Sequence, residues 1–371
     1  MIYLDNAATT VLDDEVLAAM LPYLKSNYGN SQSQHAAGRA AAQGLISARD
    51  KVAAIFGCKS EEVYFLSGGT EAGNLAVKGV CSAHGKGHLI ISAIEHPAVL
   101  ESARDMQKLG FAVTFIQPDS RGIIPPEEVE KAVRLDTIFC AVMAANNEIG
   151  TLQNVQKIGE ICTRYNVFYY CDCVQAVGAM PFPVGEANAF AVSAHKFHGP
   201  KGVAAMYIKG GSKINGIISG GRQERGLRGG TVNVASAVGL ALALEKAVKG
   251  EHTAKIADLR NQFVNRILTE IKGTHLNGDP VQRVPSNANI SFDGCDGENI
   301  LFCLDLKGIC VSTGSACSAG AVTPSHVITA TVGEARAKSA VRFTFGKYNT
   351  AEEVNYTISA LKEIVSKIRK T

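Results

Sequence analysis

The sequence predicts an α/β protein, with a large domain built on a mainly parallel sheet and a smaller α+β domain beside it. Through the first two-thirds of the 371 residues, short apolar runs alternate with stretches of helical periodicity. Strands that alternate with crossover helices of roughly 10 to 15 residues build a parallel sheet with helices on both faces. This alternation stops near residue 232. We therefore expect a large domain at residues 13–250 and a small domain made of residues 1–12 and 251–371.

Six apolar runs in the large domain have the length and composition of strands. They lie at residues 61–68, 88–96, 111–117, 137–146, 167–172 and 189–196. Four helical stretches connect the first five of these runs, at residues 70–84, 97–110, 125–134 and 155–166. A run that is apolar throughout suits a strand that is covered on both faces, as in a parallel sheet.

The later part of the chain has a different pattern. Residues 231–271 follow one long helical period, which we expect to bridge the two domains. Beyond it, the strands "NANISFDG" (287–294) and "AVRFTFG" (340–346) alternate irregularly with helices near 297–306 and 350–370. Such a mixture predicts the smaller α+β domain.

Composition limits the class of protein. Hydrophobic residues make up 46% and charged residues 19%, and the net charge of +3 is too small to indicate a nucleic-acid partner. The N-terminus has no basic segment followed by an apolar one, and no apolar run reaches the ~20 residues that span a bilayer. The ten cysteines are scattered without a CxxC pair, which favours a reducing compartment. We expect a cytoplasmic protein that is not bound to a membrane.

Cys171 and Cys173 form a C-x-C sequence that allows two interpretations. The pair could hold a metal, or the two side chains could pack at the end of a strand. No second ligand pair has the spacing of a metal site, so packing is the favoured interpretation.

Polar residues gather where the expected strands end. "LSGGTEAGN" is a glycine-rich turn from a strand into a helix, in which Gly69 and Thr70 could bind a phosphate or merely begin the helix. The carboxyl ends of parallel strands form the ligand-binding edge of a sheet. A lysine, a carboxylate, an imidazole and a phosphate turn together suit pyridoxal phosphate, whose ring acts as an electron sink. The other candidates at this edge are His96, Asn147, Asp172, Ser193, His195 and Lys196.

The ordered set of motifs resembles the cysteine desulfurases of the NifS/IscS type, which are fold-type I pyridoxal-phosphate enzymes of the class-V aminotransferase family. The resemblance covers nearly the whole chain. The motifs are "YLDNAATT", "SGGTEAGN", "EHPAV", "NNEIG", "DCVQAVG", "SAHKFHGPKG", "GGRQERGLRGGT", "STGSACSAG", "PSHV" and "VRFTFG".

The resemblance implies a role for each candidate toward pyridoxal phosphate. Lys196 would form the Schiff base, and Asp172 would pair with the ring nitrogen. His96 would stack on the ring and transfer protons. Gln175 and Asn147 would approach the ring hydroxyl, and Asn147 would also approach the substrate. The phosphate would be held by Gly69, Thr70, Ser193 and His195, with Thr231 reaching it from the neighbouring subunit of a homodimer.

The resemblance also implies the reaction, which is conversion of L-cysteine to L-alanine. Arg342 would bind the substrate carboxylate. Cys317, in "STGSACSAG", would take the sulfur as a persulfide and pass it to an acceptor, either a scaffold for iron–sulfur clusters or a tRNA-thiolating enzyme. No resident metal is expected, although Cys317 could be a transient ligand of an iron–sulfur cluster. Arg342 is followed by 29 residues (371 − 342), fewer than in the IscS type, whose tail helps to dock the scaffold.

Three other functions share parts of this pattern. Selenocysteine lyases share the cofactor chemistry, and turnover of cysteine against selenocysteine would separate the two activities. An aminotransferase has no use for Cys317. A scaffold for sulfur transfer without enzymatic activity would not need Lys196, Asp172 and Cys317, all of which are present.

Overall fold

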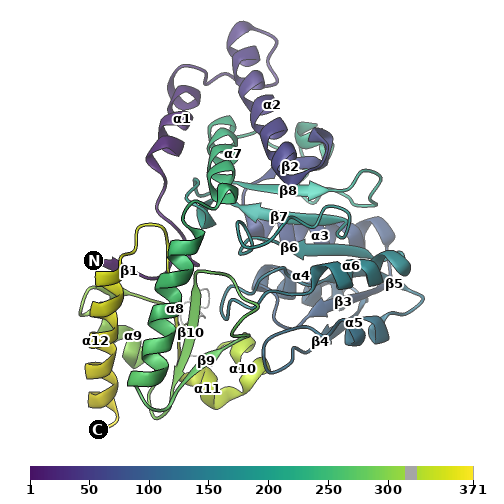
Figure 1. Ribbon diagram of the computed structural model, residues 1–371. Coiled ribbons are helices and arrows are strands. Elements are labelled where there is room, and N and C mark those ends of the chain that lie inside the picture. Colours follow the sequence, from purple (N-terminus) through teal and green to yellow (C-terminus); the bar gives the residue numbers. More distant parts are fainter. Residues whose placement is uncertain (314–323, 371) are drawn as a thin grey trace.

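A computed structural model describes residues 1–313 and 324–370 (Figure 1). Cys317, the expected nucleophile, lies outside these ranges. Within them, no helix has the length and apolar character that a membrane span requires.

The larger sheet has seven strands, and six of them point the same way. Only β8 runs antiparallel to both of its neighbours, β2 and β7. The prediction of a mainly parallel sheet is therefore confirmed. In spatial order the strands are β2 (Val63–Leu66), β8 (Ala204–Ile208), β7 (Ala189–Ser193), β6 (Phe168–Asp172), β5 (Thr137–Ala141), β3 (His88–Ser92) and β4 (Ala112–Ile116).

Helices cover both faces of this sheet, as the apolar character of the strands requires. On one face, α3 (Gly69–His84) and α4 (Pro97–Lys108) bury an apolar core against it. On the other face a second core includes residues of α5 (Pro126–Ala132), α6 (Val155–Arg164) and α7 (Val234–Lys249). The expected helices at 70–84, 97–110, 125–134 and 155–166 are confirmed, with ends that differ by a few residues.

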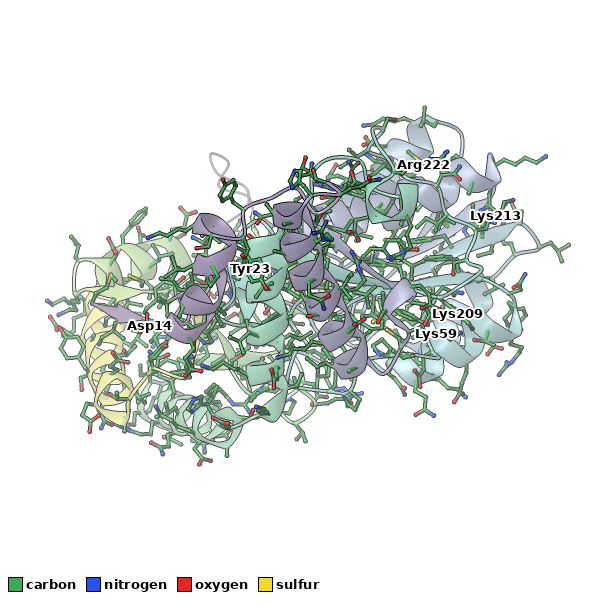
Figure 2. All side chains as sticks on the ribbon, turned by 90° about the horizontal axis from the view of Figure 1, so that it is seen from above. Asp14, Tyr23, Lys59, Lys209, Lys213 and Arg222 are labelled. Carbon is green, nitrogen blue, oxygen red and sulfur yellow. The ribbon has the colours of Figure 1, made fainter. Side chains whose placement is uncertain are left out.

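Two N-terminal helices, α1 (Asp14–Lys25) and α2 (Ala36–Phe56), both pack against α7 (Figures 1 and 2). The ring of Tyr23 on α1 lies against Gly44 of α2. A Cβ atom at Gly44 would come within 2.2 Å of this ring, so the packing of the Tyr23 ring against α2 depends on glycine there.

The expectation of one long helix over residues 231–271 is wrong. The structure has two helices, α7 and α8 (Thr253–Glu270), separated at Gly250. Gly250 adopts the left-handed conformation (φ 68°) that commonly ends a helix. The apolar periodicity continues through both helices, and periodicity alone does not show a change of direction.

The remaining elements surround a smaller antiparallel sheet with the order β12 (Ala340–Thr344), β10 (Asn287–Phe292), β9 (Thr274–Asn277). Its core is separate from the other two. In that core Phe263 of α8 meets Phe343 of β12 with ring centroids 4.8 Å apart. The other elements here are α9 (Gly297–Asp305), α10 (His326–Val332), α11 (Glu334–Lys338), α12 (Ala351–Ile368), and the pair β1 (Ile2–Tyr3) and β11 (Ile309–Cys310). The domain boundaries at residues 12/13 and 250/251 stay a prediction.

The N-terminal segment connects the two sheets. Asp5 forms an isolated bridge with Thr344 at the end of β12. A few residues on, the backbone N–H of Thr10 donates to the carbonyl oxygen of His195 (2.8 Å), just beyond the end of β7. The segment between them therefore lies across the carboxyl edge of the larger sheet.

Candidate active site

Six strands of the larger sheet have their carboxyl ends at the same edge, and most of the polar residues singled out in the sequence follow five of them. β7 ends at Ser193 and leads into the short helix η2 (Ala194–Lys196), while β6 ends at Asp172. β5 and β3 lead to Asn147 and His96, and β2 leads to Gly69 at the start of α3. At this edge the charge of Lys196 lowers the pKa values of Asp172, His96 and His195.

Lys196 is held by the N-terminal segment. Its Nζ atom donates to the carbonyl oxygens of Ala7 (2.6 Å) and Ala8 (2.9 Å). The side-chain amide of Gln175 also donates to the Ala7 oxygen (2.9 Å). Lys196 and Gln175 thus meet at one backbone oxygen. The sequence indicated neither Ala7 nor Ala8 as part of the site, because a backbone carbonyl has no signature in the side chains.

Asp172 is a buried carboxylate beside a second one. Burial raises the pKa of Asp172 to about 6, although the backbone N–H of Val174 and the charge of Lys196 both lower it. Glu95 is fully buried, and burial together with the charge of Asp172 raises its pKa to about 8. Near neutral pH, Glu95 is therefore the protonated member of this pair. We did not single out Glu95 from the sequence, although a charged residue directly after an apolar run is a usable signal.

His96 is the N-cap residue of helix α4, and its ring caps the helix. Its Nδ1 atom accepts a hydrogen bond from the backbone N–H of Ala98 (3.1 Å), which assigns the proton of the neutral ring to Nε2. Burial and the charges of Lys196 and His326 lower the pKa of His96 to about 4. The ring is neutral at physiological pH, with an N–H available at its other end.

The turn before α3 exposes unpaired backbone donors. Among the described residues, the N–H groups of Gly69, Thr70 and Glu71 have no acceptor. A Cβ atom added to Gly68 would meet no atom within 4 Å, so the space in front of the turn is open. Helix N-termini with free N–H groups favour anions such as phosphate.

The two residues expected to join Gly69 and Thr70 at the phosphate lie at the end of β7, which β8 separates from β2 in the sheet. Ser193 is buried as the last residue of β7, and the Nδ1 atom of His195 lies 3.2 Å from the Oγ1 atom of Thr9. Burial and the charges of Lys196 and Lys201 lower the pKa of His195 to about 4. His195 is thus a neutral hydrogen-bonding group.

Arg342 on β12 meets the larger sheet at Asn147. Its Nη1 atom donates to the carbonyl oxygen of Asn147 (2.9 Å), and its Nη2 atom pairs with Oδ1 of Asp5 (2.8 Å). The Nε atom is buried and has no partner among the described residues. Two of the five guanidinium N–H groups are therefore used, and the others are available for a carboxylate. The sequence did not single out Asp5 as a site residue.

Next to Arg342 lies another buried carboxyl group, Glu148. It accepts a hydrogen bond from the hydroxyl of Ser325, and burial raises its pKa to about 7. Its backbone carbonyl accepts from the side chains of Asn287 (3.0 Å) and Asn289 (3.1 Å) of the smaller sheet. These bonds fix the loop that carries Asn147 to the smaller sheet.

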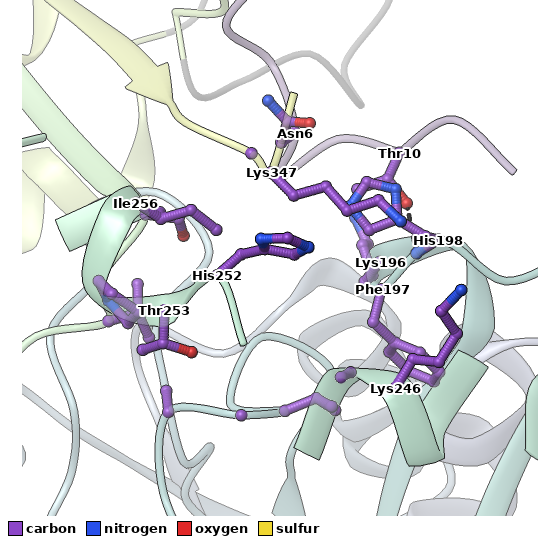
Figure 3. Close-up of a pocket in the computed structure, with 18 of the residues that line it drawn as sticks. Asn6, Thr10, Lys196, Phe197, His198, Lys246, His252, Thr253, Ile256 and Lys347 are labelled. Carbon is purple, nitrogen blue, oxygen red and sulfur yellow. Dashed lines mark hydrogen bonds between the residues drawn. The ribbon is translucent and has the colours of Figure 1, made fainter. Parts of the chain in front are cut away.

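A cavity of about 180 Å³ opens beside Lys196 (Figure 3). Thr10 and His198 lie on one side of it, and His252 projects into it from the start of α8. It lies where the N-terminal segment, α7, α8 and the turn after β12 meet. Lys196 is therefore located at the junction between the two sheets.

The remaining candidates are more isolated. Thr231 is exposed and makes no hydrogen bond with another described residue. Cys171 and Cys173 are buried with their sulfur atoms 3.8 Å apart, and both belong to an apolar core. Within the described ranges, no cluster of three or more histidine, cysteine or acidic side chains suits a metal ion.

Comparison with known proteins identifies a family that matches nearly the whole chain. The family model for class-V aminotransferases matches residues 2–357. A protein of Dictyoglomus turgidum described as cysteine desulfurase IscS is 44% identical and covers 99% of this chain and 95% of its own length. A protein of the same description from Methanosarcina thermophila is 42% identical, covering 99% of this chain and 93% of its own length.

Solved structures agree with the fold. One described as a NifS-like protein superposes with a TM-score of 0.92 at 38% identity, over 99% of both chains. Another, described as SspA in complex with cysteine, has a TM-score of 0.83 at 30% identity, over 94% of this chain and 100% of its own. The fold-type I prediction is confirmed by these structures.

Proposed function

The chain belongs to the class-V aminotransferase family, and we propose from this premise that it is a pyridoxal-phosphate-dependent cysteine desulfurase. It converts L-cysteine to L-alanine and leaves the sulfur on Cys317 as a persulfide for an acceptor protein. The observation that carries this proposal is the meeting of Lys196, Asp172 and the open turn at Gly69 at one sheet edge. Full-length relatives at about 40% identity described as cysteine desulfurases support it.

The chemistry of these groups fits pyridoxal phosphate. An amine, a buried carboxylate and a set of free backbone N–H groups match its aldehyde, its ring nitrogen and its phosphate. Lys196 would hold the cofactor covalently, and Asp172 would pair with the ring nitrogen. Gly69, Thr70, Ser193 and His195 would hold the phosphate, with Gln175 and Asn147 near the ring hydroxyl. When bound, the cofactor withdraws electrons from the substrate Cα, which makes the Cα proton acidic.

The residues of the chain would then bind the substrate and move its protons. Arg342 offers its remaining N–H groups to the substrate carboxylate, held in place by Asn147 and Asp5. Once the substrate amine has displaced it from the cofactor, the Nζ atom of Lys196 would take the proton from the substrate Cα. His96, neutral and with Nε2–H available, exchanges protons on the ring face.

The sulfur transfer balances with Cys317 as nucleophile. Its thiolate attacks the sulfur of L-cysteine, an S–S bond forms and the Cβ–S bond breaks. The electron pair of the Cβ–S bond stays with the carbon, and protonation of Cβ forms the C–H bond of L-alanine. Cys317 keeps the transferred sulfur as a persulfide, and thiolate attack by an acceptor protein removes it.

A homodimer is part of this proposal. Helix α1 presents Leu17, Leu21 and Leu24 at helical spacing, and these residues are 41%, 40% and 55% exposed. An exposed apolar stripe of this kind marks a surface for a protein partner. Thr231 in its exposed loop would complete the phosphate site of the second copy.

The proposal is tested with purified protein, pyridoxal phosphate and L-cysteine. We expect a yellow protein that releases alanine and, with a thiol reductant, an equal amount of sulfide. Alanine release without sulfur transfer, or a colourless protein that does not bind the cofactor, would contradict it. Parallel turnover of L-selenocysteine separates desulfuration from the lyase activity.

A further inference from the structure

A carboxylate lies at the turn that would receive the phosphate. Glu71 is in the first turn of α3, directly after Thr70, and its side chain is only 7% exposed. Its Oε2 atom accepts the backbone N–H of Ser67 (2.6 Å), which fixes the path of the chain from β2 into the helix. Glu71 thus stabilises the conformation of the turn, but its negative charge would repel a phosphate anion bound at the same helix end.

Arg228 supplies the opposite charge. Its Nε atom lies 3.0 Å from Oε1 of Glu71. Burial disfavours ionisation of Glu71, but the bonds from Ser67 and Arg228 outweigh it and hold the pKa of Glu71 below its ordinary value. At physiological pH the two side chains are therefore a charged pair, 157 residues apart in the sequence (228 − 71).

The loop around Arg228 places this side chain firmly. Arg228 forms a parallel bridge with Ile218, and the N–H of Gly229 donates to the Ile218 carbonyl (3.1 Å). A Cβ atom at Gly229 would come within 2.8 Å of the Cα atom of Gly220, so the two strands of the loop touch through glycine backbone.

A second ion pair holds the bend of the same loop. Glu224 and Arg225 both adopt positive φ angles (44° and 55°), which are unfavourable for residues other than glycine. The buried carboxylate of Glu224 makes two bonds to Arg49 (2.6 and 2.8 Å) and accepts the backbone N–H of Phe65 (2.9 Å). The strained conformation is kept because these bonds fix the bend to α2 and β2.

We propose that Arg228 is a positioning residue for cofactor binding, which neutralises Glu71 so that this carboxylate can fix the turn without repelling the phosphate. This inference rests on the proposed function, because the phosphate belongs to the proposed cofactor. Arg228 acts through Glu71 and so makes binding selective for the phosphorylated form of the cofactor. Removing Arg228 leaves the partly buried negative charge of Glu71 beside the phosphate. Removing the charges of Arg228 and Glu71 together abolishes this repulsion.

The test compares two ligands that differ only in the phosphate. Full-length protein is freed of cofactor with hydroxylamine, and equilibrium dialysis gives the Kd values of pyridoxal phosphate and of pyridoxal. The variants are R228Q, E71Q and the double variant E71Q/R228Q. R134Q is the control, because it also removes one positive charge but from an exposed pair with Asp136. Wild-type binding of pyridoxal phosphate, measured first, tests the proposed function separately.

We expect R228Q to weaken binding of pyridoxal phosphate by about tenfold, the effect of one uncompensated charge near a partly buried site. Binding of pyridoxal should change by less than about threefold, because it has no phosphate charge to repel. The double variant should recover to within about threefold of E71Q. R134Q should match the wild type for both ligands.

Two results would overturn the inference. If R228Q weakens both ligands equally, the arginine has a general structural role. If the double variant stays as weak as R228Q, the arginine contacts the phosphate itself and Glu71 is not involved. Failure of the wild type to bind pyridoxal phosphate would instead contradict the proposed function.

Discussion

The guanidinium group of Arg342 is shared between the two parts of the molecule: its Nη2 atom pairs with Asp5 at 2.8 Å, while its Nη1 atom binds the Asn147 carbonyl. Asp5 precedes the segment that holds Lys196 through Ala7 and Ala8. The expected carboxylate-binding arginine and the expected covalent lysine are therefore both located by residues 5–8. This connection between them is a property of the tertiary structure.

Arg342→Gln is expected to raise the KM for L-cysteine by about 100-fold, the loss that follows from removing one charge-assisted bidentate contact. Cofactor absorbance should not change, because the proposed partner of Arg342 is the substrate carboxylate and not the cofactor. Arg342→Lys keeps the charge without the planar fork and should give an intermediate KM. A variant with normal KM and reduced kcat would show that Arg342 does not bind the substrate carboxylate.

Lys196→Ala should lower turnover by at least about 10³-fold, because the proposed covalent attachment and the proposed proton transfer both depend on its Nζ atom. Borohydride reduction of the wild-type protein should fix the cofactor to Lys196. Peptide mapping by mass spectrometry locates the adduct. Its appearance on Lys201 or Lys209 would refute the assignment.

Cys317→Ser should keep full cofactor absorbance while alanine release falls by orders of magnitude, since a hydroxyl at neutral pH is a poor nucleophile toward sulfur. Cys310→Ser, at a cysteine that is only partly buried, serves as the control and should retain activity. Near-normal alanine release by the Cys317 variant would assign the sulfur transfer to another of the ten cysteines.

Glu95 should make the cofactor-free protein less stable at alkaline pH. Burial raises its pKa to about 8, so between the ordinary pKa of 4.5 and about 8 the folded state binds more protons than the unfolded state. Stability from this group is therefore full at low pH and is lost as the pH rises through this range. Glu95→Gln, which mimics the protonated acid, should raise Tm relative to wild type more at pH 8 than at pH 5. An equal change in Tm at both pH values would contradict the raised pKa of Glu95.

The dimer is tested by mixing two inactive variants, Lys196→Ala and Thr231→Ala. If Thr231 completes the site of the neighbouring subunit, each heterodimer should contain one site with both residues intact. Activity should return to about half of the wild-type value per heterodimer, since one of two sites is restored. Exchange of subunits is checked with a mass-tagged copy. Exchange without recovered activity would place Thr231 in its own subunit's site or outside the chemistry.

Much of the fold could be read from local pattern. The alternation of apolar runs with helical stretches located the strands and connecting helices of the larger sheet, because burial on both faces leaves a continuous apolar run. The same reasoning failed at Gly250, where a left-handed glycine turns the chain between two helices of similar periodicity. Periodicity reports which face of a helix is buried, and contains little information on where the chain changes direction.

The sequence by itself determined the strand-end residues that meet at one sheet edge, such as Asp172 and Lys196, because parallel strands bring their carboxyl ends together wherever they lie in the chain. Only the tertiary structure decided which distant residues bind the site side chains. Ala7 binds Lys196, Asp5 binds Arg342, and Arg228 binds Glu71. Asp5 and Arg342 are 337 residues apart. Such pairs depend on how the N-terminal segment and the loop before α7 fold back over the sheet. The path of these two segments is set by the packing of the whole chain, and local residue patterns contain no information on it.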